Sequence, residues 1–133
     1  MIKNLKKGFE WLKGIQPGSS GPVGFILQLN ELEVGRLLYS DGLWHFRYSE
    51  EFQKQDEFRE ITDFPAKDRV YTSKDLWPFF ALRIPSLAQP RVKEWAQAQE
   101  SEEAANEASM LKYFGRVTAA NPFVLNPLQE TFS

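Results

Sequence analysis

The first half of the chain alternates apolar side chains with other residues at a period of two, which predicts β-strands. The alternation runs over residues 24–29 and returns over residues 32–39 and 43–48. Between the last two segments stands Asp41-Gly42, a pair typical of a type I′ hairpin because both central residues of that turn need positive φ. The pattern therefore predicts an antiparallel meander.

Two features add detail to this meander. Gly35 stands inside the second segment, where a glycine indicates a bulge or the close approach of another part of the chain. Trp44, Phe46 and Tyr48 alternate along the third segment and so share one of its faces. We expect this aromatic face to belong to the core.

The segment after the meander gives weaker signals. Ser49 is suited to cap a short turn that continues through residues 50–52. Residues 58–62 are predicted as a fourth strand, and residues 70–71 as a brief return to the sheet. Residues 63–69 between them are expected to form a polar loop.

Prolines place the next helix. Its predicted start is near Leu76, after a cap at Asp75, because Pro78 then falls in the first turn, where its missing N–H costs nothing. The helix should end before Pro85, since a residue that precedes proline disfavours helical backbone.

Two further helices and a tail are predicted beyond Pro85. Pro90 suits the first position of a helix. Another helix is predicted from a cap at Ser101 to Gly115, a residue type that commonly ends helices. Residues 116–133 are expected to be an extended tail.

The size and composition of the chain favour one folded domain. Its 133 residues are 42% apolar, with 11 phenylalanines, which is enough to build a core and too much for a disordered chain. We therefore predict an α+β fold in which two to three helices pack against a small curved antiparallel sheet. Residues 23–115 form this domain, between an N-terminal helix and linker (1–22) and the C-terminal tail (116–133).

The N-terminal segment has an amphipathic pattern. Ile2, Leu5, Phe9 and Leu12 recur at helical spacing, and lysines lie mostly off this stripe. A short packed or frayed helix is favoured over a membrane-surface helix or a partner helix. Because charges interrupt every apolar run, no signal peptide or membrane span is expected, and the cytoplasm is the expected location. A Pro/Gly/Ser linker follows, so residues 1 to about 20 should be dispensable for folding.

Composition also narrows the chemistry. The chain has no cysteine and a single histidine, His45, in mid-strand with no carboxylate cluster around it. A metal site, a cofactor and a set of catalytic residues are therefore not expected, and His45 is interpreted as a surface or structural residue. No nucleophile elbow or phosphate-binding loop occurs. The formal charge of -2 argues against nonspecific nucleic-acid binding.

One segment has more large apolar residues than a short helix can bury on one face. It is Leu76-Trp77-Pro78-Phe79-Phe80, with Arg83 near the end of the predicted helix. All of these side chains could be core, but we favour at least one aromatic as an anchor for a partner protein. The candidate partner-binding residues are Trp77, Phe79, Phe80, Arg83, Ile84, Pro85 and Ser86.

Several motifs occur here in an order that matches a known family. They are Val34-Gly35-Arg36-Leu37, then Trp44-His45-Phe46-Arg47-Tyr48, then the segment from Tyr71 to Phe80, and Pro85. In this order they resemble the first N-terminal subdomain of HipA-type Ser/Thr kinases, which are toxins of bacterial toxin–antitoxin systems. The resemblance covers about residues 23–98 and implies the same α+β fold.

Two differences between this sequence and the kinases point to a more specific group of relatives. Arg83-Ile84-Pro85-Ser86-Leu87 stands where the kinases commonly have Leu-Leu-Pro, an acidic residue and glycine. The kinase core does not follow, and residues 114–123 resemble the ends of stand-alone, HipS-like proteins. In those systems the small protein is the antitoxin of a HipT-like kinase, and a helix-turn-helix, HipB-like protein supplies DNA binding.

The resemblance thus implies a protein-binding module that docks on a HipA-type kinase lacking this subdomain and restrains it. A nucleic-acid-binding module remains the alternative, since small curved sheets with exposed aromatics can stack bases. An enzyme is the least favoured class, because no nucleophile and base stand together in any motif.

Overall fold

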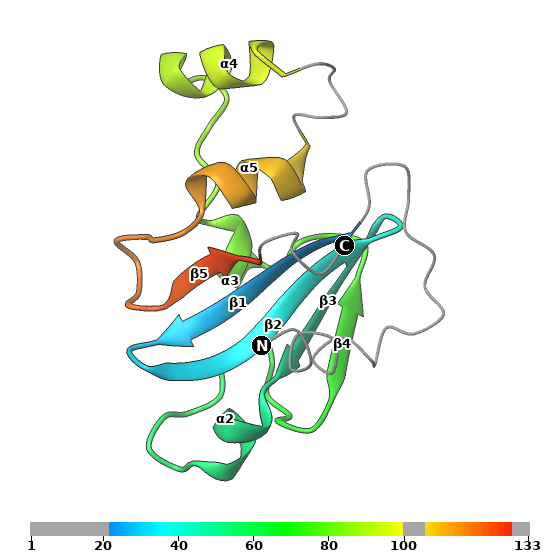
Figure 1. The fold of residues 1–133 in the computed structure, drawn as a ribbon, viewed down its shortest axis with the longest axis vertical. Helices are drawn as coiled ribbons and strands as arrows, with labels where there is room; N and C mark the ends of the chain where they lie inside the picture. Colours follow the sequence, from blue (N-terminus) through cyan, green and yellow to red (C-terminus); the bar gives the residue numbers. More distant parts are fainter. Residues whose placement is uncertain (1–21, 100–105, 129–133) are drawn as a thin grey trace.

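The computed structural model describes residues 22–99 and 106–128, and their fold is α+β as predicted. The strands form one open antiparallel sheet in the order β4-β3-β2-β1-β5 (Figure 1). The described part of the chain has four helices, one more than the upper expectation. The elements are β1 (Val23–Leu29), β2 (Leu32–Ser40), β3 (Leu43–Tyr48), α2 (Glu50–Lys54), β4 (Val70–Ser73), α3 (Pro78–Ala81), α4 (Pro90–Gln97), α5 (Glu107–Phe114) and β5 (Val124–Pro127).

The predicted meander is confirmed by β1, β2 and β3. Asp41 and Gly42 have φ values of 52° and 79°, as the hairpin turn between β2 and β3 requires. Gly35 lies at a bulge, one of the two features expected of it, because the β1–β2 register shifts beside it. A Cβ there would also lie 2.5 Å from the carbonyl oxygen of Arg47.

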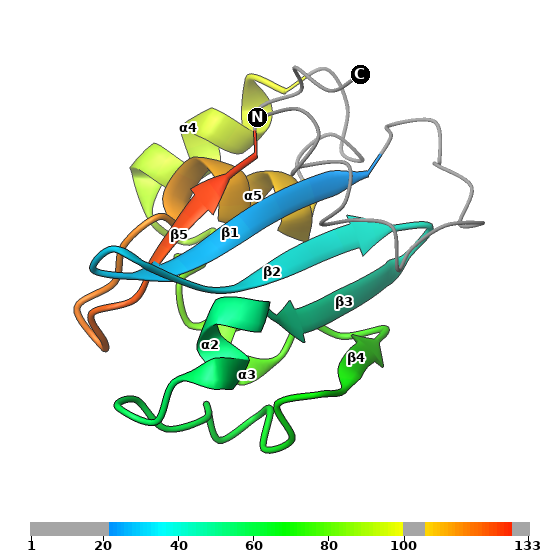
Figure 2. The ribbon, with the colours of Figure 1, turned by 60° about the horizontal axis from the view of Figure 1, so that its bottom comes forward.

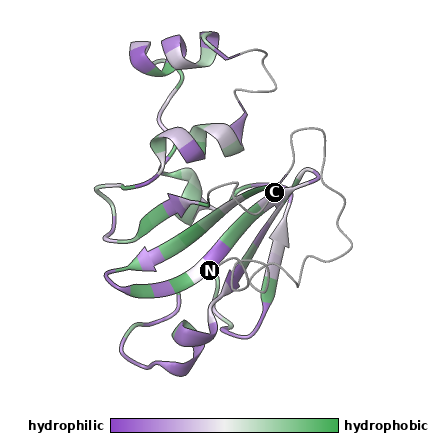
Figure 3. Ribbon diagram, viewed as in Figure 1, coloured by the Kyte–Doolittle hydropathy of each residue, from purple (hydrophilic) through white to green (hydrophobic). Residues whose placement is uncertain are grey.

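The core lies on the face of the sheet that bears the β3 aromatics. Trp44, Phe46 and Tyr48 are all at most 1% exposed, which confirms that the aromatic face is core. Phe46 stacks on Phe64, with 4.2 Å between ring centroids. Figure 3 shows hydrophobic residues concentrated in the strands, whereas α2 is mostly hydrophilic.

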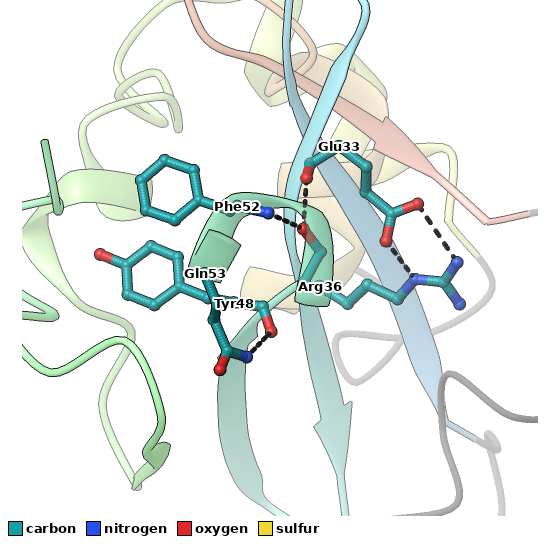
Figure 4. Close-up of polar contacts among 6 residues, drawn as sticks. Glu33, Arg36, Tyr48, Phe52 and Gln53 are labelled. Atoms are coloured by element: carbon teal, nitrogen blue, oxygen red, sulfur yellow. Dashed lines mark hydrogen bonds and ion pairs between the residues drawn. The ribbon is translucent and has the colours of Figure 1, made fainter. Parts of the chain in front are cut away.

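The short helix α2 begins at the predicted cap. Ser49 accepts a hydrogen bond from the Phe52 N–H at 2.9 Å, and its own hydroxyl donates to the Glu33 carbonyl of β2. Figure 4 shows α2 held against the sheet through these bonds and through Gln53, whose amide donates to the Tyr48 carbonyl. One serine therefore both starts the helix and ties it to β2.

The prediction of a strand at residues 58–62 is wrong. The neighbour of β3 is β4, which pairs with it from Arg47↔Val70 to Trp44↔Ser73. In residues 58–62, the backbone forms hydrogen bonds with side chains and not with a neighbouring strand. Gln55 accepts from the Phe58 N–H, and the Tyr48 hydroxyl accepts from the Ile61 N–H, both at 2.8 Å.

The sheet also continues past the predicted domain end at residue 115. β5 pairs antiparallel with β1, with Leu125 opposite Leu27, so part of the segment assigned to the tail is an edge strand. Its four residues are too few to show an alternation, and Pro127 argued against a strand. An edge position tolerates that proline because one side of the strand needs no ladder partner.

The helices after Pro85 match their predicted bounds at Pro90 and Gly115 but not at Ser101. α4 begins at Pro90 and α5 ends at Gly115, as expected. α5 is capped by Asn106, whose side chain accepts from the Ser109 N–H at 2.9 Å, and not by Ser101. Ser101 itself and the predicted N-terminal helix and linker, up to residue 21, lie outside the described residues.

The helices differ in their distance from the sheet. Figure 1 shows α5 between the sheet and α4, and Figure 2 shows α2 on the sheet near β2 and β3. α4 packs on α5 through Trp95, whose ring centroid lies 5.4 Å from those of Tyr113 and Phe114. Ala108 and Leu111 of α5 belong to the core cluster, whereas α4 lies farther from the sheet.

His45 predicts a pH dependence of stability. Its side chain is 5% exposed, Nδ1 lies 3.2 Å from the Thr72 hydroxyl, and burial lowers its pKa below 6.5. His45 therefore binds a proton more readily in the unfolded chain than in the folded chain. The free energy of unfolding decreases as the pH falls below 6.5. We expect urea unfolding between about pH 7.5 and about pH 5.5 to show a steeper loss for the wild type than for His45→Gln. Equal losses would contradict this role of His45.

Candidate partner-binding site

The aromatic segment after β4 is fixed at its start by a contact distant in sequence. α3 begins at Pro78 with Trp77 as its N-cap, two residues later than predicted. Asp63 explains the shift, because its carboxylate accepts from the Phe79 N–H at 3.0 Å and caps the helix from another loop. Proline at the first helical position fits this start, since its missing N–H needs no partner. Asp63 therefore links the loop at residues 59–63 to the start of α3.

The aromatic excess divides between two faces of α3. Phe80 is fully buried, with its ring 5.7 Å from Phe46 and 6.0 Å from Phe64 between centroids. Phe79 is partly exposed, and Leu82 is 49% exposed. Phe80 is therefore a core residue with no surface for a partner, which corrects its place in the predicted site.

Trp77 has a mixed position. Its ring meets Phe64 edge-on at 4.9 Å and packs against the core, but the side chain is only partly buried. Truncation of Trp77 would therefore remove core contacts together with surface. Phe79 is likewise partly buried and packed against the core, so a binding test with either variant needs a measurement of its stability beside it.

Arg83 is the largest departure from the sequence prediction. It is 4% exposed, so its guanidinium does not face a partner. Burial lowers its pKa to about 10, which still leaves it charged at neutral pH. Its acceptors all lie in the segment after α5: Gly115 O (3.0 Å), Arg116 O (3.2 Å), Asn121 Oδ1 (3.1 Å) and Phe123 O (2.9 Å).

A shallow hollow of about 400 Å³ lies between α3 and the loop that caps it. Phe79 and Phe123 meet edge-on across it at 5.4 Å between ring centroids. We call this surface the α3 hollow, and its lining residues are Arg59, Glu60, Ile61, Thr62, Asp63, Pro78, Phe79, Leu82 and Phe123.

Phe123 was missed as a site residue because it follows Phe79 by more than forty positions. The only sequence signal for it was its place in the Asn121-Pro122-Phe123 stretch of the family resemblance. Ile84 and Pro85 are partly buried and Ser86 is exposed. Partner binding by these last three residues remains a prediction.

A second hollow, of about 490 Å³, lies between α4, α5 and the end of β5. Trp95 and Tyr113 line it, but so do the polar side chains of Gln99, Ser109 and Lys112. The α3 hollow also combines apolar and polar lining residues, but it includes Pro78 and Phe79 of the aromatic segment predicted to bind a partner.

Two kinds of site find no support in residues 22–99 and 106–128. Three or more His, Cys, Asp or Glu side chains do not gather there in a group that could hold a metal ion. Nor does this part of the chain contain a helix that is long and apolar enough to cross a membrane.

The fold and the motif order together define a small α+β subdomain, and comparisons with known proteins show its family. The family model of the HipA N-terminal domain matches residues 26–119. The chain therefore belongs to the HipA N-terminal domain family, which confirms the resemblance found in its sequence.

One solved structure that the fold resembles is described as the N-terminal domain of HipA toxin. The TM-score is 0.55 at 16% sequence identity, over 82% of this chain and 95% of that chain. At this identity the likeness shows a shared fold. A search of curated proteins gave no match.

Proposed function

We propose that the chain is an antitoxin-like binding module that docks on, and restrains, a HipA-type Ser/Thr kinase lacking its own N-terminal subdomain. The observation that favours this function is the match of most of the chain to that subdomain family. A kinase that lacks the subdomain would leave uncovered the surface on which the subdomain packs. This chain supplies the missing part in trans.

The α3 hollow is the proposed docking surface. Its lining combines apolar side chains, among them Phe79, Leu82 and Phe123, with the charged residues Arg59 and Glu60, and protein interfaces likewise combine apolar and polar residues. Burial of Leu82 and Phe79 by a partner would gain about 25 cal/mol for each Å² of apolar surface removed from water. The neighbouring residues Ile84, Pro85 and Ser86 extend the proposed surface along the chain.

The nucleic-acid alternative receives less support from the fold. It needs sheet aromatics exposed for base stacking, whereas the β3 aromatics are buried in the core. A helix-turn-helix, HipB-like protein is the proposed DNA-binding member of the same complex.

A kinase assay tests the proposed function. A HipA-type kinase that lacks its N-terminal subdomain is titrated with the chain, and phosphate incorporation is followed with radiolabelled ATP. We expect activity to fall in proportion to the chain added until the two proteins are equimolar. A HipA-type kinase with its own N-terminal subdomain is the control and should be unaffected. Full activity of the truncated kinase at excess chain would overturn the proposal.

A further inference from the structure

The α3 hollow is built from two parts of the chain that Arg83 joins. Arg83 follows α3 directly, and its guanidinium binds backbone carbonyls on both sides of the exposed turn after α5. Its planar group also lies 5.8 Å from the Phe79 ring centroid. One side chain thus contacts both aromatic residues of the hollow, Phe79 through its ring and Phe123 through its carbonyl.

Asn121 completes this junction. Its side-chain oxygen accepts from Arg83 Nη2 at 3.1 Å and from the Phe123 N–H at 3.1 Å. Asn121 is not among the residues that line the hollow. Its oxygen therefore links Arg83 to the backbone of Phe123 without lining the hollow itself.

The segment that Arg83 holds has few other ties. Val117 is 58% exposed, and most residues from 116 to 122 are exposed. The backbone contacts found for this segment are the Thr118↔Asn121 bridge and the bond from the Leu125 N–H to the Arg116 carbonyl. Phe123 directly precedes β5, which pairs with β1 from Val124 onward, so the sheet holds its backbone on one side and the guanidinium and Asn121 hold it on the other.

The junction also contains a buried positive charge. In the described part of the chain, no carboxylate forms an ion pair with Arg83, and carbonyl and amide oxygens surround its charge instead. A buried charge in this situation depends strongly on each acceptor, because the loss of one leaves a donor without a partner.

We propose that Arg83 and Asn121 are positioning residues for docking: they hold Phe123 against Phe79, and the α3 hollow receives the kinase only while this clamp is closed. The inference rests on the proposed function, which it deepens. The clamp makes the docking surface depend on the segment after α5 as well as on α3.

Asn121→Ala and Asn121→Asp form a matched pair for the test. The first removes the oxygen that both donors share, whereas the second keeps an oxygen there and adds a charge opposite to that of Arg83. We expect Asn121→Ala to weaken binding of the truncated kinase about tenfold at a temperature where the variant is fully folded, and to lower its Tm by several degrees because Arg83 loses an acceptor. Asn121→Asp should bind within about twofold of the wild type.

A double-mutant cycle separates positioning from general stability. In a Phe123→Ala background, Asn121→Ala should have no further effect on affinity, because its effect passes through the Phe123 ring. An additional tenfold loss in that background would overturn the clamp, and so would wild-type affinity of Asn121→Ala itself.

Phe79→Ala separates failure of the clamp from failure of the proposed docking surface. If Phe79→Ala loses binding while Asn121→Ala retains it, the clamp is wrong and the docking surface stands. If both variants bind as tightly as the wild type, the proposed docking at the α3 hollow is wrong and the clamp inference falls with it.

Discussion

Phe80→Ala is expected to lower the free energy of unfolding by ~3–5 kcal/mol. Phe80 is fully buried, and its ring packs among Phe46, Phe64 and Phe79. Truncation removes a large apolar side chain from water-free surroundings and leaves a cavity that the sheet cannot fill. A loss of this size is a large fraction of the stability of a small domain.

Urea unfolding of Phe80→Ala and of its neighbour Phe79→Ala measures this difference. Phe79 is partly exposed on the other side of α3, so its truncation should cost about 1 kcal/mol. Equal losses for the two variants would contradict the division of α3 into a core face and a surface face.

Tyr48→Phe is the second change with a large expected effect, about 2–4 kcal/mol of stability. The Tyr48 hydroxyl donates to the Phe64 carbonyl at 2.7 Å and accepts from the Ile61 N–H at 2.8 Å. Burial raises the pKa of this hydroxyl, so it stays protonated and able to donate. Its removal leaves two backbone groups without partners in the core, although the ring still fits.

The matched control is Tyr71→Phe. The Tyr71 hydroxyl bonds to the N–H and the carbonyl of Ala66, but both residues are only partly buried, so water can replace it. Chemical denaturation should show a clearly smaller loss for Tyr71→Phe. Hydrogen exchange at the Ile61 amide should accelerate in Tyr48→Phe alone. A Tyr48→Phe protein as stable as Tyr71→Phe would contradict the structural role of the buried hydroxyl.

The meander could be predicted from the sequence because its signals are local. A period of two and the Asp41-Gly42 turn act within a few residues of each other. Local signals could not decide whether residues 58–62 or β4 would pair with β3. Residues 58–62 differ from β4 because the Tyr48 hydroxyl, thirteen residues before Ile61, binds their backbone. Tertiary hydrogen bonds of this kind leave no periodic pattern.

The sequence predicted a partner-binding segment between residues 77 and 86, and the structure divides its residues between core and surface. Within this segment Phe79 and Phe80 are adjacent, and only packing against Phe46 and Phe64 decides which of them is buried. The donors of Arg83 were predicted to bind a partner, but in the structure they bind oxygens of the same chain. Its acceptors lie 32 to 40 residues later in the same chain, a distance that no local signal spans.

Titration of the truncated HipA-type kinase with wild type, Leu82→Glu and Val70→Glu tests the central claim most directly. Leu82 and Val70 are 49% and 41% exposed, so each glutamate should be tolerated by the fold, but only Leu82 lines the α3 hollow. We expect wild type and Val70→Glu to bind alike and Leu82→Glu to bind at least about thirtyfold more weakly, with melting temperatures that stay close together. Equal affinity of all three proteins, or no binding by the wild type, would contradict docking through the α3 hollow.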